Sequence, residues 1–462
     1  MIAHLSGRLT SLLVCAACCL TPASVHASDE ATTALAADVH ALREEVQRLR
    51  QELDAVRLLL RKVGRSAVPG ALGSRPVQVA VDSQPGAHPP DPRIELLQAQ
   101  VAELAQTKVE GASRLPIRLF GTVHSHTFTN TGEANWLDLP NIVPERPADG
   151  RTGSFASALR QTRLGLAFDG PSIGAARTSG VVAFDFFGGI PGFQTGQAMG
   201  LPRLLVAFAR VEGERTALHV GQDHMVLAPR DPSSLAAFAF PALFRSGNLY
   251  LRAPQVTVER ELVGGLRLSG GVMTPNAGDL PEAYRFVPPA LAGERSRLPA
   301  VQARLGYMRG APDARHHAAV AVSGHYGRER RGETLGTSWA GVVDGAVRRG
   351  RFGVAGEAFV GANIDAFGGG TGLDGRSAGG WGELQVFPTD RVRVHAGAGV
   401  DARRREHPLV PRRRTRSAYG NVMYAFTPEL EASVEYSWLA TLPGVGAERR
   451  NHHLDWVLVY RF

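Results

Sequence analysis

The chain has 462 residues, a formal net charge of +8 and a hydrophobic fraction of 44%, so it is too long for one ordinary small domain. After the first 27 residues no run of about 18 apolar residues occurs, which excludes a membrane-spanning helix there. The basic residues are mostly scattered arginines and do not gather on one predicted helix. This pattern argues against a helix that reads nucleic acid.

Residues 1–27 have the pattern of a secretory signal peptide. His4 and Arg8 precede the short apolar segment "LLVCAACCL", and small residues favour cleavage after Ala27. All three cysteines lie in this segment, so we expect no disulfide or thiol chemistry in the mature chain. The alternative is a lipoprotein that is acylated at Cys18. Both interpretations predict that the protein leaves the cytoplasm.

Residues 28–63 carry a heptad repeat. Leu35, Leu42 and Leu49 are spaced by seven, a second apolar set interleaves with them, and Arg, Glu and Gln occupy the faces between. This pattern predicts an α-helical coiled coil, and the alternative is one amphipathic helix that packs on its own domain. A Pro/Gly-rich linker is expected at residues 64–93, followed by a short second helix at 94–109.

The periodicity changes to that of β-strands in residues 115–462. Short runs of about ten residues alternate apolar with polar or small side chains, and about 16 such runs can be marked. The runs start near Ile117, Arg160, Gly180, Arg203, Thr216, Gly247, Leu262, Leu298, His316, Ser338, Phe352, Gly379, Arg391, Arg416, Glu429 and His452.

The lengths of the connections support one arrangement of these runs. Connections after odd-numbered runs are mostly long, and those after even-numbered runs are mostly short. A soluble sandwich or a β-propeller gives no reason for that parity, whereas a barrel in an outer membrane has short periplasmic turns and long outer loops. Only a closed barrel satisfies all the backbone groups of strands in a bilayer. We therefore predict an all-β transmembrane barrel of about 16 antiparallel strands, preceded by the coiled-coil segment.

The polar face of each run is expected to line a water-filled lumen. Arginine dominates this face in the first half of the barrel and acids dominate several later runs, which predicts a transverse field and a weak to moderate preference for small anions. The alternative is that each arginine only pairs with an acid or with water. The residues predicted to set selectivity are Arg118, Arg163, Arg203, Arg252, Arg267, Arg304, Arg391, Arg393, Asp185, Glu357 and Glu383. Other residues predicted to face the lumen are His124, His126, His395, Glu431, Glu435 and Arg461.

The third long connection, residues 223–246, is unusually apolar for a loop in water. Folding into the lumen would bury its segment "LAAFAFPALF" and would place Arg230 and Asp231 at a constriction. The alternative is a loop that packs at a subunit interface. The basic run "RRRTR" at 412–416 is expected in an outer loop, where it would bind lipopolysaccharide phosphates or attract anions, or would simply be solvated.

The order of these segments resembles the DcaP-like porins of Gram-negative outer membranes. The local phrases "IRLFGTV", "RQTRLGLAF", "FDFFGG", "VGQD" and "LRAPQV" carry the resemblance, over residues 117–259. It implies trimeric 16-stranded barrels, coiled coils in the periplasm and uptake of small anions such as dicarboxylates. The residues to which the resemblance assigns this anion uptake are Arg163, Arg203 and Arg252.

Other chemistry is not expected. Histidine pairs such as His124 and His126 lack the neighbouring ligands of a metal site, and two Gly-x-Ser-x-Gly matches lack the strand-turn-helix context of a hydrolase. We therefore predict a porin and not an enzyme, with no cofactor and no nucleic-acid partner. The alternative is a structural anchor whose coiled coil tethers the membrane to the cell wall or to a periplasmic partner.

The final segment, "LDWVLVYRF", alternates like a strand. Its aromatic and aliphatic residues are expected to face lipid, and Asp455 and Arg461 to face the lumen. We predict that this strand closes the barrel against the run at Ile117, which removes both free edges. Trp456, Tyr460 and Phe462 are predicted to form the signal that the barrel assembly machinery reads.

Overall fold

The computed structural model describes residues 117–189, 200–275, 290–312, 314–370, 375–403 and 412–462. The predicted signal peptide, coiled coil, linker and second helix lie outside these residues and stay predictions. Three short 3₁₀ helices occur in the described part: η1 (Val263–Gly265), η2 (Glu294–Ser296) and η3 (Asp365–Phe367). No helix within the described ranges has the length and hydropathy needed to cross a bilayer.

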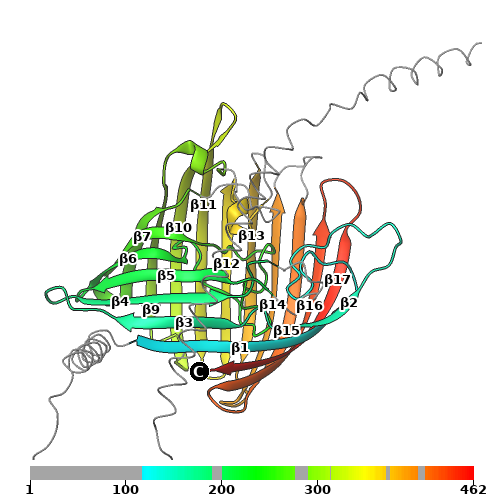
Figure 1. Cartoon of the computed structure of the whole chain (residues 1–462), viewed down its shortest axis with the longest axis horizontal. Helices are drawn as coiled ribbons and strands as arrows, with labels where there is room; N and C mark the ends of the chain where they lie inside the picture. Colours follow the sequence, from blue (N-terminus) through cyan, green and yellow to red (C-terminus); the bar gives the residue numbers. More distant parts are fainter. Residues whose placement is uncertain (1–116, 190–199, 276–289, 313, 371–374, 404–411) are drawn as a thin grey trace, which may run out of the picture. The chain divides into compact units, whose positions relative to one another are not determined.

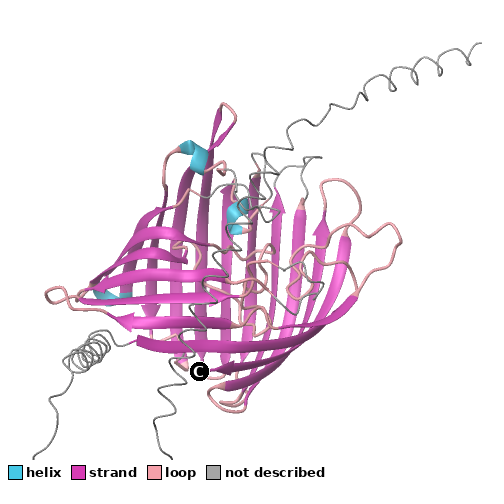
Figure 2. Cartoon of the chain, viewed as in Figure 1, coloured by secondary structure: helices cyan, strands magenta, loops and turns pink. Residues whose placement is uncertain are grey.

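Strands dominate the described part of the chain (Figure 2). They are β1 (Ile117–Asn130), β2 (Ser154–Ala158), β3 (Arg163–Asp169), β4 (Arg177–Asp185), β5 (Arg203–Glu212), β6 (Thr216–His224), β7 (Arg252–Glu261), β8 (Leu266–Met273), β9 (Ala300–Arg309), β10 (His316–Arg331), β11 (Thr334–Arg349), β12 (Phe352–Ala362), β13 (Arg376–Val386), β14 (Val392–Arg403), β15 (Arg414–Ala425), β16 (Leu430–Leu442) and β17 (Arg449–Arg461).

Every strand from β3 to β17 pairs antiparallel with its neighbour in the sequence, and β1 closes the ring (Figure 1). One edge of β1 pairs with β17, from Thr122↔Arg461 to Asn130↔His453. The other edge pairs with both β2 and β3, which therefore occupy one strand position interrupted at residues 159–162. The prediction of a closed, 16-stranded antiparallel barrel is confirmed.

The barrel exposes apolar side chains on its outer surface and buries polar ones inside, which is the reverse of a soluble protein. In β17, Trp456, Leu458 and Tyr460 face outward and are 44%, 47% and 48% exposed, whereas Asp455 and Val459 face inward and are fully buried. This alternation has the period of two that a strand imposes. An apolar outer surface of this kind is stable only in contact with another apolar phase.

The connections alternate between long and short around the barrel. Two connections at the long-loop end are exceptions because they are short. Residues 131–153, 225–251 and 274–299 are long connections, and residues 213–215 and 350–351 are tight turns at the opposite end. The exceptions are residues 332–333, which join the 16-residue strands β10 and β11, and residues 443–448 between β16 and β17. The β10–β11 hairpin extends beyond the neighbouring strands (Figure 1).

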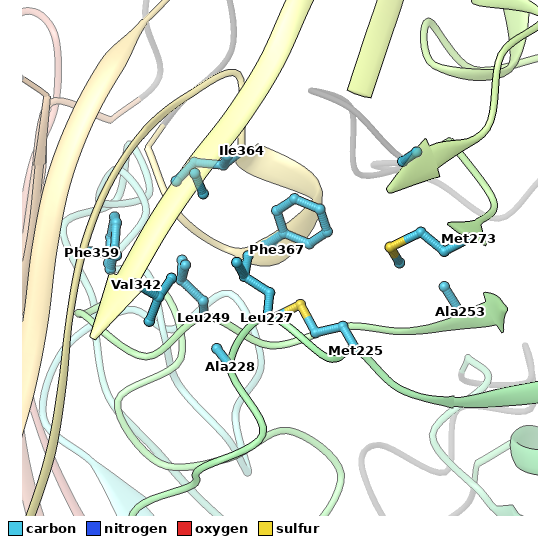
Figure 3. Packing of buried hydrophobic residues seen from close by; sticks show 12 residues of the cluster. Met225, Leu227, Ala228, Leu249, Ala253, Met273, Val342, Phe359, Ile364 and Phe367 are labelled. Atoms are coloured by element: carbon cyan, nitrogen blue, oxygen red, sulfur yellow. The ribbon is translucent and has the colours of Figure 1, made fainter. Parts of the chain in front are cut away.

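A compact apolar cluster lies inside the barrel, between connecting segments and the inner wall. Leu227 and Leu249 of the connection 225–251 pack with Phe367 of η3 and with Val342 and Phe359 of the wall (Figure 3). A second cluster joins Leu235 and Ala236 to inward-facing side chains of β15 and β17. Part of the inward face that connecting segments cover is thus apolar.

Candidate functional site

The connection at residues 225–251, hereafter the inner loop, contacts strands from widely separated parts of the wall. The Leu227 amide donates a hydrogen bond to Gln302 Oε1 of β9 over 2.9 Å, and the Leu249 amide donates to Glu357 Oε1 of β12 over 3.2 Å. The Leu235 carbonyl accepts a 2.7 Å hydrogen bond from His124 Nε2 of β1. These contacts hold the inner loop inside the barrel.

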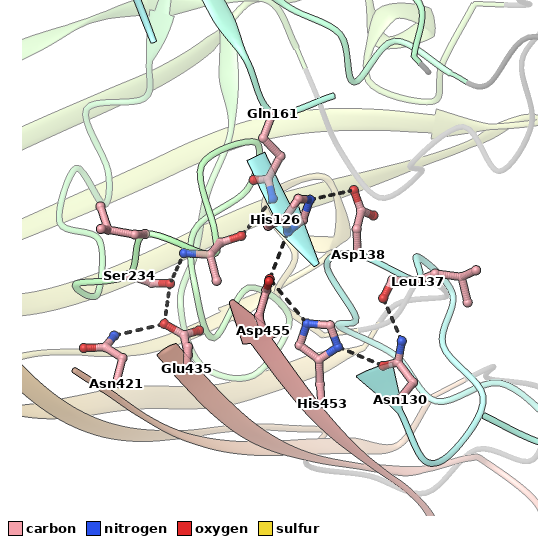
Figure 4. Close-up of polar contacts among 12 residues, drawn as sticks. His126, Asn130, Leu137, Asp138, Gln161, Ser234, Asn421, Glu435, His453 and Asp455 are labelled. Atoms are coloured by element: carbon pink, nitrogen blue, oxygen red, sulfur yellow. Dashed lines mark hydrogen bonds and ion pairs between the residues drawn. The ribbon is translucent and has the colours of Figure 1, made fainter. Parts of the chain in front are cut away.

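Two buried carboxylates anchor the middle of the inner loop. The Ser233 amide and hydroxyl donate to Glu383 over 2.6 and 2.9 Å. The Ser234 hydroxyl donates to Glu435 over 2.6 Å (Figure 4). Asn421 donates one hydrogen bond to the Ser233 carbonyl and another to Glu435, both of 2.9 Å. Glu383 and Glu435 face the interior and are buried. They bond to the inner loop and thereby hold it in place.

Arg163, Arg203 and Arg252 lie together on the other side of the inner loop. Arg163 donates to the Phe238 carbonyl, and Arg203 donates to the Ala239 carbonyl over 3.1 Å. The guanidinium carbon of Arg252 lies 5.2 Å from the centre of the Tyr250 ring. Burial raises the pKa of Tyr250, and the charges of these three arginines oppose that shift. All three cations therefore lie within electrostatic range of Tyr250, and Arg252 is the one that contacts its ring.

These arginines differ in how far acids neutralise them. Arg203 makes a two-bond ion pair with the buried Asp185, with distances of 3.0 and 2.6 Å. The polar contacts of Arg163 and Arg252 given above are to a carbonyl and to an aromatic ring, which carry no formal charge. The positive charge at this place is therefore compensated only in part.

Arg230 and Asp231 lie on the inner loop and have different neighbours. Arg230 Nε lies 3.0 Å from Asp344 Oδ1, and Asp344 also accepts a 2.9 Å hydrogen bond from Arg304. Asp231 Oδ2 lies 3.7 Å from His224 Nε2. Burial raises the pKa of Asp231 to about 6, although the nearby Arg252 charge and a hydrogen bond from Asn248 lower it.

The other residues predicted to line the lumen are spread along the wall. Arg267 lies between Glu259 and Glu261, at 3.1 and 2.7 Å. Arg393 and Arg461 both pair with Glu431, and Arg118 is an exposed residue of β1. A cavity of about 320 Å³ is lined by Arg230, Arg267, Ser269 and Arg304, among others.

Two sequence predictions are wrong in position. Arg391 was expected on a strand facing the lumen, but it is an exposed residue of the turn before β14, where its carbonyl accepts a hydrogen bond from the Ala425 amide. The run at 412–416 was expected in an outer loop, but Arg414 and Arg416 lie on β15. Arg412 is buried and donates to the Arg245 carbonyl over 2.7 Å. At the starts of β14 and β15 the arginines continue from the connecting segment into the strand. The alternation of side chains alone therefore did not show where each strand begins.

Sequence reasoning also missed parts of the buried network. Asp344, the partner of Arg230 and Arg304, was not selected, although it follows Val342 and precedes Ala346 at the spacing of one strand face. His126 Nδ1 lies 2.9 Å from Asp455 Oδ2 across the closing seam, and His453 bonds to Asn130 (Figure 4). Within the described ranges no group of three or more His, Cys, Asp or Glu side chains is arranged to hold a metal ion.

Solved structures with the same architecture give an independent comparison. The outer membrane channel DcaP of Acinetobacter baumannii aligns with a TM-score of 0.58 and 15% identity, over 76% of this chain and 98% of that one. The chain has the porin fold. The anion-selective porin from Comamonas acidovorans aligns with a TM-score of 0.52 and 11% identity, over 75% of this chain and all of that one.

The comparison confirms the predicted resemblance to DcaP-like porins at the level of the fold. Sequence comparison adds nothing further, because no protein-family model matches the chain and no curated protein matches it significantly. What the porin-fold barrel does is therefore argued from its own residues.

Proposed function

We propose that this protein is an outer-membrane porin, a passive channel for small hydrophilic solutes. The observation that carries the proposal is the reversed distribution of side chains, with apolar residues exposed on the outer face and charged residues buried on the inner face. A closed barrel with this pattern suits a bilayer, and 16 strands enclose more space than wall side chains can fill. The porin fold of two solved channels supports the same function.

We propose that the channel prefers small anions, dicarboxylates among them. Arg163 and Arg252 lie inside the barrel against a carbonyl and an aromatic ring, where an anion adds the missing negative charge. Planar guanidinium groups bind carboxylates with two parallel hydrogen bonds, so neighbouring arginines suit a solute with two carboxylates. The inner loop forms the constriction in this proposal, with Arg230 and Asp231 on it.

The remaining parts of the proposal concern location and assembly. A signal peptide directs export, the barrel lies in the Gram-negative outer membrane, and the N-terminal segment lies in the periplasm. The barrel assembly machinery inserts the chain, and outer-membrane lipid with lipopolysaccharide surrounds it. A homotrimer is the assembly that the resemblance to DcaP-like porins implies.

Reversal potentials test the anion preference. For the purified full chain in a planar bilayer under a KCl gradient, we expect a reversal potential whose sign shows that chloride permeates more readily than potassium. Replacing two partly buried arginines in Arg163→Gln/Arg252→Gln is expected to lower the chloride-to-potassium permeability ratio severalfold, because fixed charge in a narrow lumen sets selectivity.

A matched control removes the same charge from outside the lumen. Arg260→Gln/Arg309→Gln changes two exposed arginines at the short-turn end and is expected to leave the permeability ratio at the parental value. Cation preference of the parent protein contradicts the proposal, and so does an equal loss in the control.

The competing function is a structural tether, with the barrel only as an anchor. Its specific support is the number of hydrogen bonds that hold the inner loop across the barrel, including those from Ser233, Ser234 and Leu249. A tether needs no steady ion current. Conductance of the purified protein therefore separates the two functions.

A further inference from the structure

Three arginines gather on the outer face of the barrel, at the end with the long connections. Arg416 of β15 and Arg450 of β17 both lie beside Ala440 of β16 in the strand register, and Arg414 is two residues from Arg416 on the same face. Their neighbours in sequence, Thr415 and Asn451, are fully buried on the inner face. The arginines therefore point away from the lumen.

One carboxylate contacts all three arginines. Glu448, in the connection 443–448, lies 2.7 Å from Arg416, 3.4 Å from Arg414 and 3.3 Å from Arg450. The slight burial of Glu448 raises its pKa, but hydrogen bonds and charge from Arg416 outweigh that and leave the pKa lowered. Within the described part of the chain, three positive charges thus share one negative charge, which leaves an excess of positive charge at the cluster.

The arginine side chains of the cluster are partly exposed. The Nε atoms of Arg414 and Arg416 have no hydrogen-bond partner within the described part of the chain, but both atoms are buried, so neither is itself open to an acceptor from outside. The side chains of Arg414 and Arg416 are each 40% exposed, and that of Arg450 is 64% exposed. The guanidinium groups are therefore accessible to an acceptor from outside the protein.

Aromatic rings mark the depth of the cluster. The guanidinium carbon of Arg416 lies 5.6 Å from the Trp438 ring, and Trp438 pairs with His452 on β17. Tyr436, one step further along the same face, bonds to His452 over 2.7 Å. Aromatic residues of barrels form girdles at the level of the lipid headgroups, where the apolar band ends. The arginines lie on the loop side of these rings.

We propose that Arg414, Arg416 and Arg450 form a binding site for the phosphate groups of a lipid in the outer leaflet, with lipid A as the ligand class. Arginine binds phosphate through paired charge-assisted hydrogen bonds, and clustered arginines at headgroup depth bind phosphorylated lipids. This inference rests on the outer-membrane placement proposed above.

Native mass spectrometry of the full chain in detergent tests the site, with bisphosphorylated lipid A as the probe. Lipid A is expected to remain bound to the parent protein, and Arg414→Gln/Arg416→Gln/Arg450→Gln is expected to weaken binding about tenfold or more. The matched control, Arg177→Gln/Arg260→Gln/Arg309→Gln, removes three exposed arginines at the opposite end of the barrel. It is expected to bind lipid A like the parent.

Two further arms identify the chemistry with the parent protein alone, so they hold even if a variant fails to fold. Lipid A without its phosphates is expected to bind at least about tenfold more weakly than bisphosphorylated lipid A. Inorganic phosphate is expected not to displace bound lipid A. Equal binding of the dephosphorylated lipid, full displacement by inorganic phosphate, or equal loss in the control overturns the proposal. The triple variant is expected to keep parental conductance, so failure of the lipid site is distinguishable from failure of the porin function.

Discussion

At the scale of single residues, Phe462 joins the last strand position to the first. Its amide and carbonyl bond to the Gly121 carbonyl and amide over 3.1 and 3.0 Å, and its ring lies over Gly121, where an added Cβ would be 2.5 Å from Cζ. Gly121 is thus the residue that lets an aromatic ring cover the seam. The ring is 47% exposed on the outer face.

Replacing this aromatic residue with an acid tests its role in assembly. Phe462→Asp places a carboxylate on the lipid-facing side of the seam, at a cost of about 1 kcal/mol near the membrane boundary, so we expect roughly fivefold less assembled barrel. Quantifying heat-modifiable barrel in isolated outer membranes measures this. Phe462→Tyr should assemble normally, and parental levels of the Asp variant would show that the terminal aromatic residue is not a signal.

The carboxyl group of Asp231 is expected to make the ion selectivity depend on pH. Its pKa is raised to about 6, so the group is negative above that pH and becomes neutral below it. Because Arg252 lies nearby, loss of the negative charge increases the net positive charge at the inner loop. The chloride-to-potassium permeability ratio should therefore rise as the pH falls from about 7.5 to about 5.

The variant Asp231→Asn should keep a high permeability ratio at both pH values. Asp390→Asn, which changes an exposed aspartate whose partner Arg315 is also on the surface, should retain the parental pH response. His224, 3.7 Å from Asp231, is the other titratable partner. An unchanged pH response in Asp231→Asn would assign the effect to another titratable group.

At the scale of elements, the inner loop depends on anchors from the acidic wall. Hydrogen bonds to charged groups contribute about 1.5–3 kcal/mol each, so Glu383→Gln/Glu435→Gln should loosen the segment around Ser233. Trypsin should then cut after Arg230 faster in the folded barrel. Glu259→Gln/Glu261→Gln removes two acids that contact Arg267, and should leave the cleavage rate unchanged. Equal rates in all three proteins would mean that other contacts hold the loop.

Alternation located the strands well and their ends less well. Predicted starts at Arg203, Thr216, His316 and Phe352 coincide with strand starts, because each run directly follows a connecting segment in which the alternation stops. The start predicted at Gly247 lies five residues before β7, since the end of the inner loop is as apolar as a strand. β10 and β11 continue beyond the expected limits because their outer ends carry polar residues without an apolar band.

The alternation along each strand predicted whether a side chain points into the barrel or outward. It could not predict the residue with which that side chain forms an ion pair or a hydrogen bond. Asp185, Glu357 and Glu383 all face inward and are buried, as the alternation indicates. The partners depend on the stagger between strands and on the path of the inner loop. Arg230 and Asp344 are 114 residues apart in the sequence, and no local pattern links them. Therefore the sequence predicted a charged lumen but not which charges neutralise each other.

At the scale of the whole molecule, the barrel should conduct without the N-terminal segment. A chain that keeps its signal peptide but lacks residues 28–114 should show the parental single-channel conductance, because the strand pairs that close the barrel begin at residue 117. The stability of the proposed trimer on native gels should decrease if the heptads join subunits. Deleting residues 64–93 alone serves as the control for chain length. Loss of steady current in the longer deletion would favour the tether.

The closing seam has a consequence for biosynthesis. Nine residue pairs join β1 to β17, the first and last of the described strands in chain order. These hydrogen bonds cannot form until the ribosome has made both strands, so the barrel closes only after all of its strands have been synthesised. A prematurely terminated product would keep two unpaired edges, which promote aggregation. Such a product would also stay open to periplasmic proteases, so the ring itself distinguishes finished chains from unfinished ones.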